Sequence, residues 1–158
     1  TDTPIPPPLQ IARVPYLGEA AFRLMMGELG LTMMWFAAVK KRSAFPLRRY
    51  REVLRFSRGL RSTRQVFVRS LRNLSKLYKP VQDSLASVTV PALVIWGDAE
   101  PFFAVDVGRR TASAIPGARF LLIADCGHFV PAEHSETVAA AISQLIAAAA
   151  VPGSRACR

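Results

Sequence analysis

The spacing of hydrophobic residues divides the chain into two parts with different periods. Before about residue 88, apolar residues recur three or four positions apart, which is the spacing of one helix face. The pattern predicts three helical segments: Leu17 to Val39, punctuated by Gly27 and Gly30; a segment from Phe45 that stops at Gly59; and Thr63 to Leu77, ended by Pro80. The predicted apolar faces consist of Phe22, Met25, Met26 and Leu29; of Leu47, Tyr50, Val53 and Leu54; and of Val66, Phe67, Ser70, Leu71 and Leu74.

After residue 88 the pattern changes to short, continuous apolar runs. The runs "VPALVIWG" and "ARFLLIAD" are rich in aliphatic residues, which is typical of strands buried on both faces of a parallel sheet. Between them, "AVDVGRRTASAIPG" predicts a short helix that is closed by proline and glycine. A last helix is predicted over "SETVAAAISQLIAAAA", with Ser135 as its cap and an apolar stripe of Val138, Ile142, Leu145 and Ile146. The order is therefore strand, helix, strand, helix.

This order has a geometric consequence for two polar residues. Strands joined by a helical crossover are parallel, so their carboxyl ends lie at the same edge of the sheet, where open α/β sheets bind ligands. Glu100 follows the first strand and His128 follows the second. A carboxylate beside an imidazole fixes the imidazole tautomer and stabilises its protonated form, as a general base requires. Asp98 is the alternative acid.

Composition excludes several other classes of protein. With 158 residues and 51% hydrophobic content, the chain has the size and composition of about one folded domain. No apolar run reaches the ~20 residues of a transmembrane helix, and "TDTPIPPPLQ" has neither the basic start nor the apolar core of a secretory signal. The two cysteines, Cys126 and Cys157, do not make a disulfide framework, which favours a cytoplasmic location. No metal-ligand spacing and no glycine-rich phosphate loop occurs, so we expect neither a metal nor an organic cofactor.

The net charge of +10 is concentrated in one segment. Residues 40 to 79 contain fourteen lysines and arginines and a single acid, Glu52. Such a block attracts nucleic acid, anionic membranes or acidic substrates, but a solvated helical face explains it equally simply. No recognised nucleic-acid-binding motif accompanies it. We therefore expect helices that lie over the site with their arginines outward, and no specific nucleic-acid partner.

A family resemblance rests on two stretches of the second part. "VPALVIWGDAEPFF" and "IPGARFLLIADCGHFVPAEHSETVAAAI" resemble the C-terminal end of α/β-hydrolase fold enzymes. In that family the triad acid follows the penultimate strand in a W-G-x-x-D type turn. The triad histidine follows the last strand in a G-H turn, with a glutamate a few residues on. By position, the resemblance implies that Glu100 is the acid, although aspartate is commoner, that His128 is the base, and that Glu133 supports the start of the final helix. Asp98 stands where the family places a variable polar residue.

The resemblance covers Val90 to about Ile146, and it implies a helical cap before that. It gives three regions: a proline-rich lead-in and cap over 1–88, the C-terminal α/β-hydrolase portion over 89–150, and a tail over 151–158. The fold class is α/β: the last strand–helix–strand–helix portion of a hydrolase sheet, preceded by a helical cap segment. Phe102 and Phe129 flank the predicted site and are candidates to line the substrate.

One part of the family pattern is missing. None of the serines has glycines two positions before and after it, so the sequence has no G-x-S-x-G nucleophile elbow, and no aspartate or cysteine takes its place. The family places the nucleophile before the acid and the histidine, so we expect it upstream of a truncated chain that is inactive alone.

The function that the resemblance implies is hydrolysis of a small ester, epoxide or related bond by a nucleophile–histidine–acid triad. The expected partners are a small-molecule substrate and either the missing N-terminal half or further copies of this chain. Two alternatives stay open: an inactive binding or interaction module derived from a hydrolase, and a basic surface-binding protein.

Overall fold

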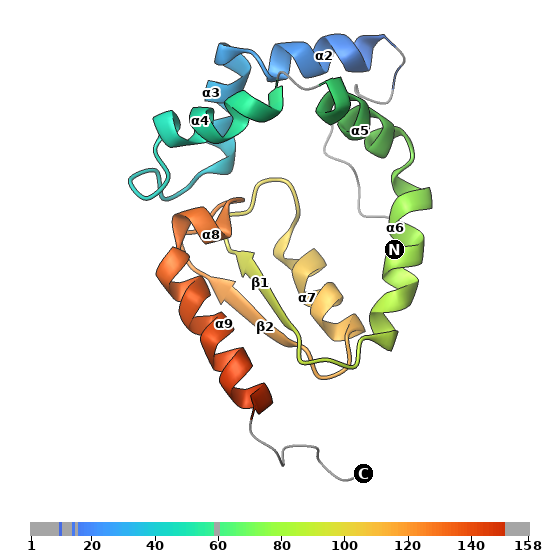
Figure 1. Cartoon of the computed structure of the whole chain (residues 1–158), viewed down its shortest axis with the longest axis vertical. Helices are drawn as coiled ribbons and strands as arrows, with labels where there is room; N and C mark the ends of the chain where they lie inside the picture. The colour runs from blue at the N-terminus through green and yellow to red at the C-terminus, as the bar shows by residue number, and fades with distance from the viewer. Residues whose placement is uncertain (1–9, 11–13, 15, 59–60, 151–158) are drawn as a thin grey trace.

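The computed structural model describes residues 10, 14, 16–58 and 61–150, and it consists of helices around a small parallel sheet (Figure 1). The elements of the first part are α2 (Leu17–Met25), α3 (Glu28–Ala38), α4 (Leu47–Arg58), α5 (Arg61–Arg72), α6 (Leu74–Ser84) and the 3-10 turn η2 (Leu85–Ser87). Those of the second part are β1 (Leu93–Gly97), α7 (Val105–Ala114), β2 (Arg119–Ile123), α8 (Val130–Glu133) and α9 (Ser135–Ala150). The predicted strand, helix, strand, helix order is confirmed, with α8 as an added turn of helix before α9.

The sheet brings the ends of both strands to one edge. β1 and β2 pair in parallel, with Ile95 opposite Leu121 and Gly97 opposite Ile123. Helix α7 packs on one face, where Gly108 lies against the Trp96 ring. Helix α9 packs on the other face, where Ile123 and Val138 share a buried cluster. Figure 1 shows both arrows pointing toward α8, with α3 and α4 beyond it. Helices α3 and α4 therefore lie over the carboxyl edge of the sheet.

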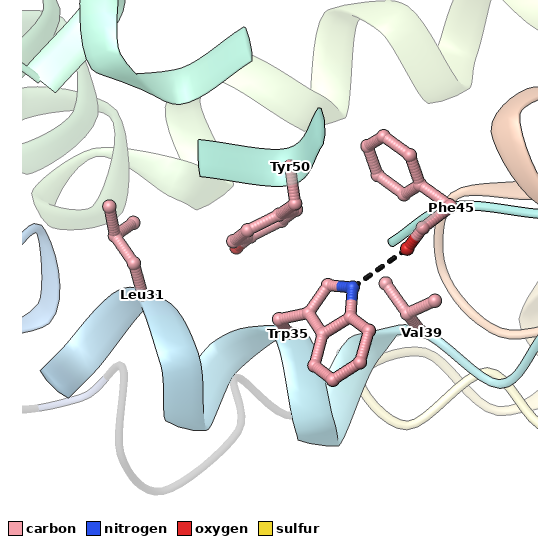
Figure 2. Close-up of a cluster of buried hydrophobic side chains, with 5 residues drawn as sticks. All are labelled: Leu31, Trp35, Val39, Phe45 and Tyr50. Atoms are coloured by element: carbon pink, nitrogen blue, oxygen red, sulfur yellow. Dashed lines mark hydrogen bonds between the residues drawn. The ribbon is translucent and has the colours of Figure 1, made fainter. Parts of the chain in front are cut away.

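A separate hydrophobic core holds α3 and α4 together. It consists of Leu31, Trp35, Val39, Phe45 and Tyr50, all of them buried (Figure 2). The Trp35 indole Nε1 donates a hydrogen bond of 2.8 Å to the Phe45 backbone oxygen, so the polar atom of this large side chain is satisfied within the core. The bond fixes the loop between the two helices against α3.

The helix boundaries differ from the predicted ones in the most basic region. The third predicted helix is interrupted at Asn73, whose side-chain amide donates to the Arg69 carbonyl and competes with the helical pattern. Pro80 does not end a helix but lies inside α6, contrary to the prediction. Proline has no backbone N–H to donate to the Lys76 carbonyl. Because Pro80 and Lys76 are both exposed, water can donate a hydrogen bond to this carbonyl instead.

The predicted apolar faces are only partly the buried ones. Phe22 and Tyr50 are buried as predicted, but Leu29, Val53 and Val66 are exposed, and Val68 is buried instead of Val66. The break between α2 and α3 moves Leu29 out of the stripe of Phe22. The side chains of Phe67, Leu71 and Leu74 lie outside the described residues, so these three predictions stay open.

The basic residues of α4 to α6 do not all point outward. Arg48 is largely exposed and pairs with Glu52 one turn away. Arg72 instead turns toward Glu19 of α2, with a closest nitrogen–oxygen distance of 3.2 Å. Part of this charge therefore joins the helices to one another, and the rest faces solvent. Within the described ranges, no helix is both long and apolar enough to cross a membrane.

Both strands are less buried than predicted. Leu122 is 37% exposed, and every residue of β1 before Gly97 is only half-buried. On α9, Val138 and Ala141 are buried, whereas Ile142 and Ile146 of the predicted stripe are exposed. The physical reason is the width of the sheet. Among the described residues the sheet has two strands, each with one unpaired edge, and two strands are too few to cover a helix as long as α9. Ser135 is the first residue of α9 and not its cap.

We predict from these exposed surfaces that the 158-residue chain alone self-associates. Unpaired strand edges and exposed aliphatic side chains such as Ile142 favour edge-to-edge pairing and burial between molecules. Sedimentation velocity over a range of concentrations is expected to show species larger than the monomer. A monodisperse monomer with a sharp, cooperative thermal transition would contradict this prediction.

Candidate active site

The predicted acid and base meet at the carboxyl edge of the sheet. The turn after β1 carries Glu100, the loop after β2 carries His128, and Glu100 Oε2 lies 2.7 Å from His128 Nδ1. The hydrogen bond predicted between them is therefore present, although they stand 28 residues apart. Two backbone hydrogen bonds join the two turns: the Asp98 N–H donates to the Ile123 oxygen and the Ala99 N–H to the Cys126 oxygen, both at 3.0 Å.

Gly97 permits this close approach of the two turns. A β-carbon at this position would lie 2.3 Å from the Cys126 oxygen and 2.5 Å from the Gly127 oxygen. These are backbone atoms, so neither neighbour has a side chain that can move aside. The glycine after Trp96 thus has a structural reason: it lets the histidine loop pass directly over the end of β1.

The surroundings of Glu100 keep its carboxylate charged. The side chain is 7% exposed, and its Oε1 accepts hydrogen bonds from the backbone amides of Phe102 at 2.7 Å and Phe103 at 3.3 Å. Burial alone would raise the pKa of the Glu100 carboxyl, but the hydrogen bonds from His128 and from these amides together lower the pKa below its ordinary value.

A charged Glu100 determines which nitrogen of His128 carries the proton. An ionised carboxylate only accepts hydrogen bonds, so the neutral imidazole carries its proton on Nδ1, facing Glu100. Nε2 is then the atom that accepts a proton from a reacting group. The His128 side chain as a whole is 36% exposed.

Asp98, the alternative acid, does not face the imidazole. Its Oδ1 accepts a hydrogen bond of 3.3 Å from the Cys126 backbone N–H. Asp98 therefore contacts the backbone of the histidine loop, and the structure brings only Glu100 to the ring. This placement favours Glu100 as the acid, while its role in a reaction stays a prediction.

Aromatic rings surround the imidazole. Phe102 and Phe129 contact the His128 ring edge-to-face, with centroids 5.0 Å and 5.1 Å away. Phe103, which the sequence interpretation did not include, lies 6.5 Å away. Phe129 also packs against Phe45 and Tyr50 of the α3–α4 core. The doublet of Phe102 and Phe103 indicated an aromatic turn, but nothing local indicated the contact between Phe129 and residues some eighty positions earlier.

Glu133 lies in a different setting from the predicted one. It is 2% exposed, and it accepts backbone hydrogen bonds from the segment after α3 and from the histidine loop, rather than supporting the start of α9. The family resemblance implied a structural glutamate here but not the segment that it binds.

Cys126, the cysteine of the histidine loop, is not set up to act as a nucleophile. Cys126 is fully buried, and burial, with further contributions from the carboxylates of Glu133 and Asp98, raises the pKa of its thiol to about 12. A thiol in this state is a poor nucleophile. Across the described part of the chain, no group of three or more His, Cys, Asp or Glu residues is arranged to hold a metal ion.

Curated relatives match part of this chain. A 2-hydroxy-6-oxononadienedioate/2-hydroxy-6-oxononatrienedioate hydrolase of Paraburkholderia phymatum is 39% identical over 70 residues, which are 44% of this chain and 24% of the relative. The protein of the same name from Escherichia coli is 32% identical over 80 residues, or 51% of this chain and 26% of the relative. The matched part spans about a quarter of the length of these relatives.

Solved structures share the fold over most of the chain. A thermophilic esterase from Thermogutta terrifontis superposes with a TM-score of 0.66 at 18% identity, covering 94% of this chain and 53% of the esterase. A putative lipase from Acinetobacter baumannii also has a TM-score of 0.66, at 17% identity, with 86% and 48% coverage. The chain thus corresponds to about half of each of these proteins.

The family model described as alpha/beta hydrolase fold matches residues 30–135, which is more than half of the chain. The match includes the α3–α4 core, both strands, the Glu100 turn and the histidine loop. The geometry at the sheet edge, the superposed structures and the family model agree, and the chain belongs to the α/β-hydrolase fold family.

Proposed function

We propose that this chain supplies the cap and the acid–base pair of a hydrolase whose nucleophile comes from outside these 158 residues. The observation that carries the proposal is the 2.7 Å contact between the buried Glu100 carboxylate and His128 Nδ1. In the proposed reaction, His128 Nε2 takes the proton of the attacking nucleophile or of water, and Glu100 stabilises the imidazolium that forms. The bond that is hydrolysed belongs to a small ester, an epoxide or a related substrate.

The surroundings of the imidazole support an apolar or aromatic substrate. The rings of Phe102, Phe103 and Phe129 lie beside His128, and Phe129 connects this wall to the α3–α4 core. Sites for small molecules are usually lined by apolar side chains together with a small number of polar groups that orient the ligand. The proposed division places 1–88 as lead-in and cap, 89–150 as the hydrolase portion and 151–158 as a tail, with the first part determining substrate shape.

The experiment compares the 158-residue chain with the complete enzyme, which adds the N-terminal half that carries the elbow. Nitrophenyl esters, epoxides and the 2-hydroxy-6-oxononadienedioate that names the relatives are the substrates tested. We expect turnover from the complete enzyme and none above buffer from the chain alone, because a base and its acid cannot perform covalent hydrolysis without the group that they activate.

Two histidine substitutions provide the test and its control in the complete enzyme. His128→Ala is expected to abolish turnover, while His134→Ala, which removes an imidazole whose Nε2 hydrogen-bonds to the Asp125 backbone oxygen, is expected to retain it. Saturable ester hydrolysis by the 158-residue chain, lost on His128→Ala, would mean that the nucleophile is within the chain. Substrate binding by the complete enzyme without any turnover would favour the inactive binding module. Tight binding to anionic surfaces without turnover would favour the basic surface-binding protein.

A further inference from the structure

Glu133 is a buried carboxylate whose partners are backbone amides. It is 2% exposed, and among the described residues no lysine, arginine or histidine side chain forms an ion pair with it. Burying a carboxylate is costly unless hydrogen bonds replace its hydration. The buried carboxylate of Glu133 therefore points to a role as a hydrogen-bond acceptor, which an apolar side chain of similar size cannot take.

The two oxygens of this carboxylate connect segments that are far apart in sequence. Oε2 accepts hydrogen bonds from the N–H groups of Lys40 at 2.7 Å, Lys41 at 2.8 Å and Gly127 at 3.1 Å. Oε1 accepts a hydrogen bond from the Phe129 N–H at 3.2 Å. Lys40 and Lys41 directly follow α3, whereas Gly127 and Phe129 are the two neighbours of His128.

The backbone itself reinforces this connection. The His128 N–H donates a hydrogen bond of 2.7 Å to the Ala38 oxygen. A β-carbon at Gly127 would lie 2.3 Å from that same Ala38 oxygen and 3.0 Å from Glu133 Oε1, so the loop and the end of α3 are in direct contact. All three consecutive amides from Gly127 to Phe129 are thus held either by Glu133 or by the end of α3.

We propose that Glu133 is a positioning residue that fastens the His128 loop to the end of α3, and so holds the imidazole against Glu100. Its catalytic meaning rests on the proposed function, but the link itself is a property of the folded chain. Without the carboxylate, four backbone N–H groups lose their acceptor in a partly buried place, and the loop that carries His128 loses its side-chain link to the segment after α3 on both sides of the ring.

The first test reads the imidazole directly. The chain has only two histidines, so a sample labelled with ¹⁵N in histidine gives two imidazole signals, and His134→Gln assigns them. In the unmodified chain we expect His128 as the Nδ1–H form, with that proton hydrogen-bonded to Glu100. Glu133→Leu is expected to abolish this signature. Glu133→Gln, which keeps one acceptor oxygen, is expected to retain it in part.

Glu136→Gln is the matched control. Glu136 lies three residues away, is exposed and stands in the first turn of α9, so the same loss of charge there is expected to leave the His128 signals unchanged. An unchanged Nδ1–H signature in a folded Glu133→Leu variant would overturn the proposal, because the imidazole would then be held without the carboxylate.

Hydrogen exchange provides a second measurement, which requires no activity. In Glu133→Gln, which removes the charge and replaces one acceptor oxygen with an NH₂ donor, faster exchange is expected among the amides of 40–41 and 127–129, with those of β1 and α7 unchanged. Unchanged exchange at all of these positions would contradict the link. In the complete enzyme the same variant is expected to lower kcat about 10-fold to 100-fold with little change in KM, since a small misplacement of a catalytic group is costly. If the complete enzyme has no activity, the proposed function fails while the imidazole and exchange results still decide this inference.

Discussion

Glu100→Gln in the complete enzyme is expected to lower kcat about 10⁴-fold, the size of effect that follows when a triad acid is replaced by its amide. The structure gives a specific reason. The Phe102 and Phe103 amides donate to Oε1, so the single oxygen of glutamine takes that place and its NH₂ group faces His128 Nδ1. An amide donor at Nδ1 forces the ring proton onto Nε2, and the ring is then unable to accept the proton of the nucleophile.

Asp98→Asn is the control, because it makes the same chemical change at the alternative acid. Asparagine retains an oxygen that accepts the hydrogen bond from the Cys126 amide, so we expect kcat to stay within a few-fold of the original. Steady-state kinetics of both variants on the best ester substrate measure the difference. If Asp98→Asn proves the more damaging substitution, the assignment of the acid is wrong.

Trp35→Ala is expected to destabilise the α3–α4 core by about 3–5 kcal/mol, the usual cost of truncating a buried tryptophan. The side chain fills the centre of the cluster in Figure 2, and its loss also leaves the Phe45 oxygen without its indole donor. Hydrogen exchange of the α3 amides measures the free energy of local opening in the complete enzyme.

Met33→Ala on the same helix is the matched control for this core. Met33 is 64% exposed, so its truncation is expected to change the opening free energy by no more than about 0.5 kcal/mol. Equal protection of α3 in the two variants would show that the cluster in Figure 2 does not stabilise this helix pair.

The second part of the chain was predictable because its signals are local. The apolar runs specified both strands, and their parallel pairing followed from the helix between them. The meeting of Glu100 and His128 then required only the rule that parallel strands end at one edge. The reason for Gly97 at the end of β1 is not local, since a β-carbon there would lie 2.3 Å from the Cys126 oxygen and 2.5 Å from the Gly127 oxygen.

The first part was less predictable because distant contacts decide it. The break at Asn73 depends on a side chain that competes for one carbonyl, and Pro80 is accommodated where an exposed helix tolerates it. The half-burial of the strands follows from the width of the sheet, which no apolar run reveals. Two partners of Glu133, Lys41 and Lys40, stand 92 and 93 residues away, beyond the reach of any periodicity.

The bonds from Lys40 and Lys41 to Glu133 have a consequence for how such a chain diverges. They close a loop that runs from the end of α3 through α4, α5, α6 and both strands to α8, and the two points where it closes lie beside His128. Lengthening an anchored loop costs little, only about 0.6 kcal/mol of closure entropy for each doubling. We therefore expect insertions, deletions and new sequences between α4 and α6 to leave the contact between Glu100 and His128 in place. The helices proposed to determine substrate shape can then change, while the pair beneath them keeps its geometry.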